Sequence, residues 1–461
     1  MSDAPATAKR AEKTGADAQS LDLIEEMLDR ARKAGADQAD AIVAHATSLS
    51  HAQRLGKMER LERSESRDLG LRVIIGKKQA CVSGNDWKSD ALSELVERAI
   101  AMAKTVPDDP YCGLATAEDL GRPPFPDVDS CDHEEPAAEL LIERAKAAED
   151  AAMAVQGVSN SEGAESSWAR WSIALGASNG FRGGYENSRH GVGVSVLAGS
   201  GVEMESDYDF TSKVYGADLE DPSLIGKRAG DQAVAKLNPR KGPTTKCPVV
   251  FDPRVANSLL RHLAGAVNGA AIARGTSFLK DRMGEAVMAK GLTVIDDPHR
   301  PRGLASKPFD AEGVATTRRA LVEDGVLTTW VLDLRSARQL DLSTTGNAGR
   351  GTSSPPSPTT TNLYLEPGET SPEDMIREID SGFYVTSLMG MGVNGVTGDY
   401  SRGASGFWIE KGEIAYPVSE MTIAGNLKDM FLAMTAANDL DFRYGANAPS
   451  VRIDGMTAAG Q

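Results

Sequence analysis

The chain has 461 residues, a length at which two domains are expected rather than a single hydrophobic core. With 41% hydrophobic and 25% charged residues, its composition is that of a globular protein and not of a disordered or fibrous one. The 50 basic and 66 acidic residues give a formal net charge of -16, which disfavours broad binding to nucleic-acid backbones.

The first half of the sequence predicts a mixture of helices and strands. Residues 1–19 are small and polar and are expected to form a flexible tail, after which Ser20 is a candidate helix N-cap. A loop with five prolines is predicted over 106–133, and antiparallel strands joined by tight turns are predicted over 158–215. The other predicted elements are helices at 20–34, 89–104, 136–156 and 221–237, and strands at 40–46 and 69–75.

The second half predicts mostly antiparallel β structure. Residues Asn238-Pro-Arg-Lys-Gly-Pro break the pattern, so we place a domain boundary there, between domains at 20–238 and 239–461. A strand at 248–251 and a helix at 253–274 follow, and only 371–380 and the segment after Gly425 have a helical pattern beyond them. Two hairpins are predicted, at Val322–Val326 and Glu410–Glu413. The predicted fold class is α+β, with an N-terminal mixed helix/strand domain and a C-terminal, mainly antiparallel β domain.

The cysteines and the lack of long apolar segments predict the cellular location of the protein. Cys81, Cys112, Cys131 and Cys247 form no CxxC pair and are few for this length, which predicts reduced thiols and a cytoplasmic location. The N-terminus has no apolar region of the secretory kind, and no apolar stretch of about 18 residues occurs, so no membrane span is expected.

Several short motifs match catalytic patterns without the context those patterns require. His133-Glu134 lacks a second His one helical turn on, and the GxSxG at 176–180 is followed by a turn and strand rather than a helix. Asp380-Ser-Gly has no second copy to form an aspartic-protease dyad, and Cys131 beside His133 in a loop does not define a nucleophile and base. The GxGxxG at 390–395 is followed by turns, so those glycines line either a peptide site or a tight cluster of β-turns.

The segment 258–279, SLLRHLAGAVNGAAIARGTSFL, is the most informative one. His262 lies among leucines, Leu263 follows it directly, and Val267 occupies the next turn. A catalytic metal helix would carry a carboxylate and a second His at such positions. From these residues alone, His262 is interpreted as a packing residue.

This helix and several long segments resemble the TldD/PmbA family of peptidase-related proteins. The resemblance extends from about residue 20 to about residue 455. It is carried by GADQADAIV, DLGLRVIIGKKQACVSGND and WSIALGASNGFRGGYE in the first half, and by ARGTSFL, GLASKPFDAEGVATTRRALVEDGVLTTWVLDLRSARQL, STTGNAGRG, SPTTTNLYLEPG and GVNGVTGDYSRGASGFWIEKGEIAYPVSEMTIAGNL in the second.

The resemblance implies a two-subunit peptidase that acts on small or unfolded peptides, with zinc held by an HExxxH helix and a C-terminal cysteine of the TldD subunit. Matched residue by residue, only His262 agrees with that motif. The Glu falls on Leu263, the second His on Val267, and no cysteine follows Cys247. The chain is therefore expected to be of the PmbA (TldE) type, with no catalytic residue, metal ligand or cofactor of its own and with zinc in the partner.

The resemblance also suggests how this chain would serve such a complex. It would form a heterodimer with a TldD-like subunit, close a chamber over that subunit's zinc and admit peptides, and an exposed strand at Thr360–Leu365 could pair with their backbone. The candidate substrate contacts are polar residues within the family-like segments: Arg274, Thr276, Asn347, Asp399, Ser401 and Arg402. The alternatives are an autonomous metallopeptidase, a protein-binding regulator of DNA gyrase, and a homodimeric scaffold; nucleic acid is not an expected partner.

Overall fold

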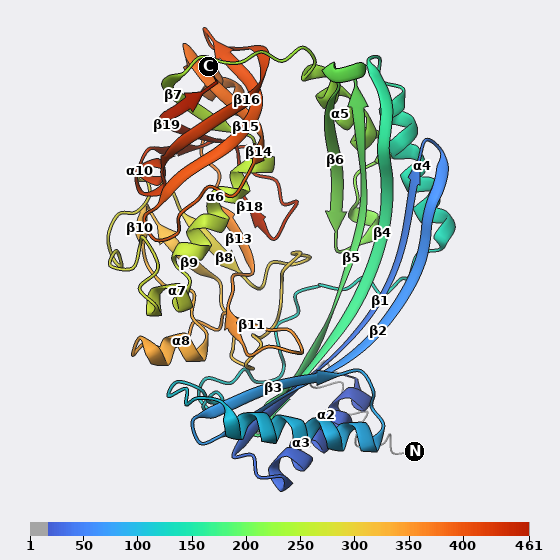
Figure 1. The fold of residues 1–461 in the computed structure, drawn as a ribbon, viewed down its shortest axis with the longest axis vertical. Helices are drawn as coiled ribbons and strands as arrows, with labels where there is room; N and C mark the ends of the chain where they lie inside the picture. The colour runs from blue at the N-terminus through green and yellow to red at the C-terminus, as the bar shows by residue number, and fades with distance from the viewer. Residues whose placement is uncertain (1–16, 461) are drawn as a thin grey trace.

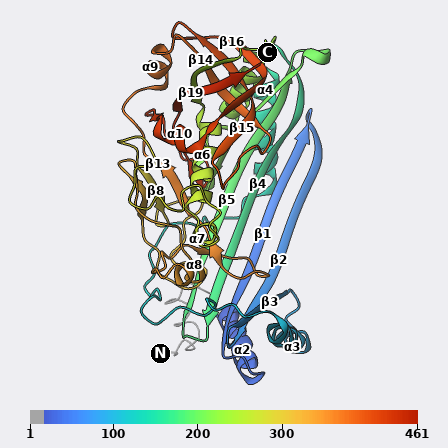
Figure 2. The ribbon, with the colours of Figure 1, turned by 60° about the vertical axis from the view of Figure 1, so that its left-hand side comes forward.

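The computed structural model describes residues 17–460, and the long strands of the first half form one antiparallel sheet in the order β3-β2-β1-β4-β5-β6. The sheet curves along the length of the molecule, and the C-terminal half lies beside it (Figures 1 and 2). Its strands are β1 (Gln38–Arg54), β2 (Lys57–Ile75), β3 (Lys78–Gly84), β4 (Val158–Ala177), β5 (Arg182–Ala198) and β6 (Glu205–Lys213).

The β1–β2 hairpin is far longer than the two short strands that the sequence predicts. Its turn is formed by Leu55 and Gly56, both with positive φ, and pairing runs from Arg54–Lys57 to Gln38–Ile74. Residues 57–67 of β2 are exposed on both faces, so they show no apolar alternation from which a strand could be recognised. The strand β3 was also not expected.

Within residues 17–460, four helices pack on this sheet. Those next to β1–β3 are α2 (Ala18–Lys33) and α3 (Ser89–Thr105), and those next to β4–β6 are α4 (Ala138–Met153) and α5 (Pro222–Ala235). Gly226 lets α5 approach α4 closely, because a Cβ there would lie 2.0 Å from the carbonyl oxygen of Ala148. The short 3-10 helices η1 (Gly201–Glu203) and η2 (Gly216–Asp218) flank β6.

The N-terminal cap of α2 corrects two predictions. Asp17, not Ser20, is the N-cap, because its carboxylate accepts a hydrogen bond from the backbone N–H of Ser20 at 2.8 Å. The helix therefore includes part of the segment predicted as a flexible tail, while residues 1–16 of that segment lie outside the described residues.

The second half is built around a closed β-barrel. A six-stranded sheet in the order β16-β15-β14-β7-β19-β17 closes because β16 also pairs with β19. Its strands are β7 (Thr245–Phe251), β14 (Ser381–Met389), β15 (Asp399–Glu410), β16 (Glu413–Asn426), β17 (Met434–Ala436) and β19 (Val451–Ala459). Residue 238, our predicted domain boundary, lies in the link between α5 and β7, and the boundary stays a prediction.

A smaller sheet in the order β10-β9-β8-β13-β18 and a two-stranded ribbon complete this half. The strands are β8 (Val294–Asp297), β9 (Arg319–Glu323), β10 (Val326–Leu327), β13 (Asn362–Leu365) and β18 (Ala446–Asn447), with β11 (Ala348–Gly349) and β12 (Ser357–Pro358) in the ribbon. The helices are α6 (Pro253–Ala266), α7 (Gly269–Ala273), α8 (Leu334–Gln339), α9 (Pro372–Arg377) and α10 (Leu427–Leu432).

The structure confirms the α+β class and both hairpins, since Asp324-Gly325 and Lys411-Gly412 all have positive φ. The single helix predicted at 253–274 is wrong, because the chain breaks between α6 and α7. There the Asn268 side chain caps α7, and Gly269 N–H donates to the carbonyl oxygen of Val331 at 2.8 Å. Helix α8 is an element that the sequence did not suggest. None of the helices within residues 17–460 combines the length and apolar character needed to cross a membrane.

Candidate functional site

Helix α6 holds His262 against an aromatic ring. Its imidazole is half-buried and meets the ring of Tyr400 edge-on, with centroids 6.0 Å apart and planes at 81°. The Nε2 atom has no hydrogen-bond partner among the described residues. Burial, followed by the nearby charges of Arg402 and Arg261, lowers the pKa of His262 below its usual value. The imidazole is therefore neutral at pH 7 and is packed against Tyr400.

The two positions that the family resemblance assigns to a Glu and a second His face the protein interior. Leu263 and Val267 are both 0% exposed and belong to the hydrophobic core of the C-terminal half. A charged or metal-binding group at either position would have to be taken out of water. At these two positions the helix contributes packing.

We expect His262→Ala to lower the free energy of unfolding by about 1–2 kcal/mol, because it removes a half-buried ring from Tyr400. Denaturant unfolding measures this loss, and zinc analysis of a TldD-type partner mixed with the variant should show unchanged metal content. His262→Phe keeps a ring in place and serves as the matched variant, with a smaller loss. A selective loss of zinc from the mixture, at unchanged stability, would show that His262 does more than pack.

Three of the six predicted substrate contacts lie together at one edge of the barrel. Asp399, Ser401 and Arg402 lie at the start of β15, beside the loop 390–398. The backbone N–H of Phe278 donates to the carbonyl oxygen of Gly395 at 3.1 Å, so the chain reaches the same loop two residues after Thr276 and four after Arg274. Asp399, Ser401, Arg274 and Thr276 are exposed, and Arg402 is half-buried.

The loop that joins these residues presents apolar side chains to solvent. Met391 and Val396 of the loop are 93% and 55% exposed, and Met389, the last residue of β14, is 61% exposed. Arg402 Nε donates to the carbonyl oxygen of Met389 at 3.1 Å, which ties the loop to β15. Flexible, exposed methionines are typical of surfaces that accept varied partners. Within this loop the GxGxxG match has no following helix, as expected from the sequence.

Asn347, the sixth predicted contact, lies elsewhere and is buried. Its amide donates to Asp296 Oδ2 at 2.7 Å and to the carbonyl oxygen of Thr359 at 3.2 Å. The same Asp296 accepts from the backbone and the hydroxyl of Thr361. Asn347 is thus part of a buried network within the small sheet, and the structure does not bring it to the other five residues.

The prediction of an exposed strand at Thr360–Leu365 is wrong. The strand β13 pairs with β8 on one edge and with β18 on the other, so both rows of its backbone groups are already engaged. Asn362, Leu363 and Leu365 are buried. A substrate strand cannot add there, because a strand can be extended only at a free sheet edge.

A polar cavity of about 490 Å³ lies between the two halves. One wall comes from β4, β5, β6 and Lys236 directly after α5, and the other from α6, β14 and β15, including Arg402. Arg254 and Lys236 both pair with Asp207, at 2.9 Å each, and Arg254 also pairs with Asp252 at 3.3 Å, so two carboxylates compensate these two cations. The Thr386 hydroxyl has no hydrogen-bond partner among the described residues. Such a lining suits a neutral polar chain, such as a peptide backbone, better than a polyanion.

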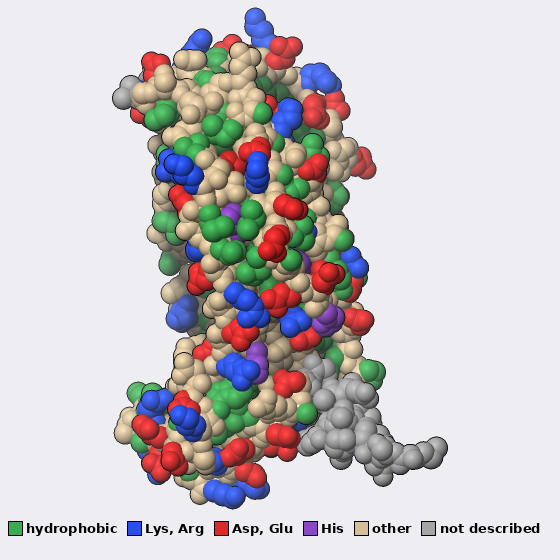
Figure 3. Space-filling view, turned by 90° about the vertical axis from the view of Figure 1, so that its right-hand side faces the viewer, with side chains coloured by type: hydrophobic (Ala, Val, Ile, Leu, Met, Phe, Trp, Pro, Cys, Tyr) green, Lys and Arg blue, Asp and Glu red, His purple; other side chains and the backbone are tan. Residues whose placement is uncertain are grey.

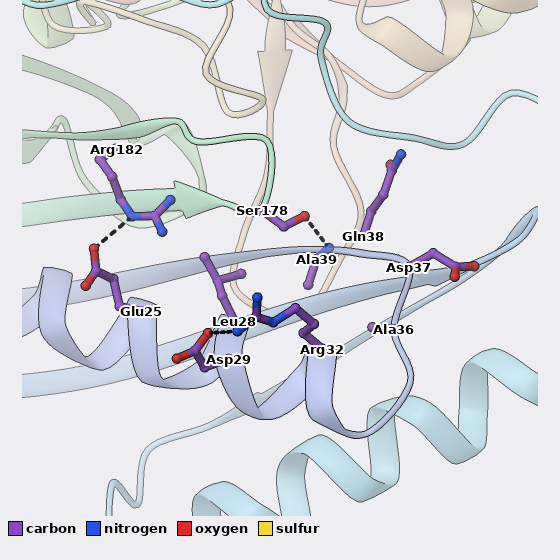
Figure 4. A pocket seen from close by; sticks show the side chains of 10 residues that line it. All are labelled: Glu25, Leu28, Asp29, Arg32, Ala36, Asp37, Gln38, Ala39, Ser178 and Arg182. Carbon is purple, nitrogen blue, oxygen red and sulfur yellow. Dashed lines mark hydrogen bonds and ion pairs between the residues drawn. The ribbon is translucent and has the colours of Figure 1, made fainter.

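A second cavity lies at the opposite end of the long sheet, and its lining residues make polar contacts with one another. It measures about 250 Å³ and lies between α2 and the turn from β4 to β5 (Figure 4). The Ser178 hydroxyl accepts from Ala39 N–H at 3.0 Å, and Arg182 Nε lies 3.6 Å from Glu25 Oε1. None of the ten labelled lining residues is His, and the printed partner of the Ser178 hydroxyl is the Ala39 backbone rather than a general base. The GxSxG match is a hairpin turn, as predicted.

One cluster that sequence reasoning dismissed is brought together by the fold. Cys131 Sγ lies 3.8 Å from His133 Nδ1, which in turn lies 3.4 Å from Glu186 Oε2. Both contacts meet the same ring nitrogen, whereas a nucleophile–base–acid relay uses both nitrogens. Burial, followed by the charge of Glu186, raises the pKa of Cys131 to about 11, so the thiol is not activated. The missed signal was the alternation in Cys131-Asp-His133, which places both side chains on one side of an extended segment.

The outer face of the long sheet carries acidic and basic side chains in mixture. In Figure 3 these charges are interspersed with apolar and uncharged residues, without a broad basic area on that face. A phosphate backbone needs a positively charged surface, so this face is unsuited to nucleic acid.

Comparisons with known proteins match this architecture over almost its whole length. Three family models fit consecutive parts of the chain: PmbA/TldA metallopeptidase domain 1 (39–103), the central domain (131–237) and the C-terminal domain (244–460). Metalloprotease PmbA of Escherichia coli O157:H7 is 38% identical over 92% of this chain and 93% of its own length.

Two solved structures have the same fold. A proposed modulator of DNA gyrase from Bacteroides thetaiotaomicron superposes with a TM-score of 0.89 at 26% identity, covering 96% of this chain and 99% of that one. TldE from Thermococcus kodakarensis superposes with a TM-score of 0.85 at 22% identity, covering 95% and 100%. The chain is thus an α+β protein that matches the PmbA/TldA metallopeptidase family models along most of its length. More specifically, the chain belongs to the PmbA/TldD family and is a PmbA-type member of it.

Proposed function

We propose that this chain is the PmbA/TldE-type subunit of a TldD/TldE-type peptidase complex that acts on small or unfolded peptides. The observation that carries the proposal is the core position of Leu263 on α6 and of Val267 directly after it, in a chain whose family is one of metallopeptidases. A zinc peptidase needs several metal ligands and a group that activates water. Of the HExxxH pattern that the family resemblance brings to this helix, α6 keeps His262 alone, so the catalytic zinc belongs to a TldD-like partner.

The role of this chain is to form part of a substrate chamber. Support comes from the polar cavity between the halves, whose wall includes Arg402, and from the exposed residues around the loop 390–398. Arg402 can donate hydrogen bonds to peptide carbonyl oxygens, because its guanidinium keeps N–H donors beyond the Nε that donates to the Met389 carbonyl oxygen. A heterodimer with the TldD-like subunit completes the site, and a cytoplasmic location agrees with four unpaired cysteines.

The test compares this chain alone, a TldD-type subunit alone and an equimolar mixture, with bound zinc and cleavage of a set of short unstructured peptides as readouts. We expect peptidase activity and zinc in the mixture, and no activity from this chain alone. The Arg402→Ala variant should raise KM several-fold in the mixture without changing its zinc content. Arg377→Ala is the control, since Arg377 pairs with Asp374 on α9, away from the loop.

Two outcomes would contradict the proposal. Cleavage by this chain alone, with zinc, would make it an autonomous metallopeptidase. Failure to associate with a TldD-type subunit, together with salt-sensitive association with DNA gyrase, would favour a protein-binding regulator. The net charge of -16 is compatible with binding a protein and unfavourable for binding the DNA itself.

A further inference from the structure

Three potential metal ligands converge where the loop before α4 runs along strand β5. Cys131 and His133 come from the loop and Glu186 from the strand. One ligand atom of each residue lies within 4.8 Å of the other two. Among residues 17–460, no other group of three or more His, Cys, Asp or Glu side chains brings its ligand atoms this close together. None of these residues lies on α6 or lines the polar cavity between the halves.

The loop is fixed to the strand by hydrogen bonds, so the ligand positions are set by backbone. Ser188 N–H donates to the carbonyl oxygen of Ser130 at 2.9 Å, and the Ser130 hydroxyl donates to the carbonyl oxygen of Glu186 at 2.7 Å. Asp132 N–H donates to the Ser188 hydroxyl at 2.6 Å, and the Asp132 carboxylate accepts from Gly216 N–H at 3.1 Å. A site prepared in this way loses little conformational entropy when an ion binds.

We propose that Cys131, His133 and Glu186 form a zinc site. A tetrahedral zinc ion with ordinary bond lengths places its sulfur and nitrogen ligands about 3.6 Å apart and its nitrogen and oxygen ligands about 3.4 Å apart. The corresponding distances here are 3.8 Å and 3.4 Å. Both fit joint coordination, and the second is longer than a direct hydrogen bond between imidazole and carboxylate.

The donor set selects the class of metal. A thiolate, an imidazole and one carboxylate suit zinc, whereas calcium and magnesium prefer oxygen ligands throughout. Cys131 is 9% exposed, while the side chains of His133 and Glu186 are 69% and 41% exposed, so an ion can enter from solvent without the loop moving.

The fourth coordination position opens into a cavity of about 540 Å³. Phe125, Tyr185 and Tyr215 contribute aromatic surface to it, beside prolines of the same loop. Three protein ligands with an open position are the arrangement of zinc sites that bind water or a small ligand, rather than of closed structural sites. The site therefore takes zinc together with an exchangeable fourth ligand.

The experiment uses the full chain alone, stripped of metal by a chelator and titrated with Co²⁺ as a spectroscopic probe of the zinc site. We expect one equivalent to bind, with a thiolate-to-cobalt charge-transfer band in the near ultraviolet and the visible bands of a four-coordinate ion. Zn²⁺ should displace the cobalt. Cys131→Ser should abolish the charge-transfer band, and His133→Gln or Glu186→Gln should weaken binding at least about tenfold.

Cys112→Ser is the matched control, because Cys112 is a half-buried thiol outside the cluster and its loss should leave the spectrum unchanged. Thermal unfolding of each variant separates a lost ligand from a lost fold. No cobalt binding, or a spectrum unaffected by Cys131→Ser, would contradict the zinc site and leave an ion pair of His133 and Glu186 beside a thiol. Because no partner subunit or peptidase readout is used, this result stands apart from the outcome for the proposed complex.

Discussion

Asp40→Ala is expected to lower the free energy of unfolding by about 3–5 kcal/mol, because it leaves two buried guanidinium groups without a counterion. Arg72 and Arg350 both pair with the Asp40 carboxylate, and their side chains are 4% and 0% exposed. Burial raises the pKa of Asp40, but Arg350 and Arg72 outweigh that effect and hold it below the ordinary value. The stabilisation is thus present above the ordinary Asp pKa and is lost as the pH falls through the lower pKa of the folded state.

This ion network matters for the architecture as well as for stability. Asp40 and Arg72 lie on β1 and β2 of the long sheet, whereas Arg350 follows β11 in the C-terminal half. The neighbouring Thr352 packs on Gly70, where an added Cβ would lie 2.2 Å from the carbonyl oxygen of Thr352. Loss of Asp40 should therefore weaken both the pairing within the long sheet and the contact between the two halves.

Urea unfolding followed by circular dichroism measures the Asp40→Ala effect. Asp231→Ala is the control, because Asp231 pairs with Lys227 on the surface of α5 and its loss should amount to no more than about 0.5 kcal/mol. Equal, small losses in both variants would show that the buried pair contributes no more than an exposed one.

Leu263→Glu is expected to destabilise the chain by more than about 4 kcal/mol, because it places a carboxylate in a fully buried apolar site. The variant restores the glutamate of the family motif beside His262. It therefore also tests whether α6 tolerates that glutamate. Thermal unfolding and recovery of folded protein are the readouts, and no zinc should be retained at α6.

The volume-conserving variant Leu263→Met is the matched comparison, with an expected loss below about 1.5 kcal/mol. It keeps the position apolar and changes only its shape. If Leu263→Glu unfolds at the wild-type temperature, position 263 is not a core position. Its burial would then no longer support the proposal that α6 holds no metal.

The sequence determined those elements whose signals are local. The helix α3 matches its predicted bounds to one residue, since Leu92, Leu95, Val96 and Ala99 follow the helical period. The two hairpin turns were predicted because Asp-Gly and Lys-Gly place positive φ angles at defined positions. The family was recognisable because its motifs are long and continuous in sequence, and the comparisons confirm it.

Tertiary structure decided everything that depends on residues distant in sequence. The strand at Thr360–Leu365 has no local feature that distinguishes a free edge from a central strand, and its burial follows from β8 and β18. The helix predicted through 274 ends at Ala266, and beyond it the Gly269 N–H donates to the carbonyl oxygen of the distant Val331. Glu186 approaches His133 only because the loop before α4 is hydrogen-bonded to β5. Periodicity and capping are properties of neighbouring residues, whereas strand edges, buried charges and ligand clusters arise from pairings that only the folded chain creates.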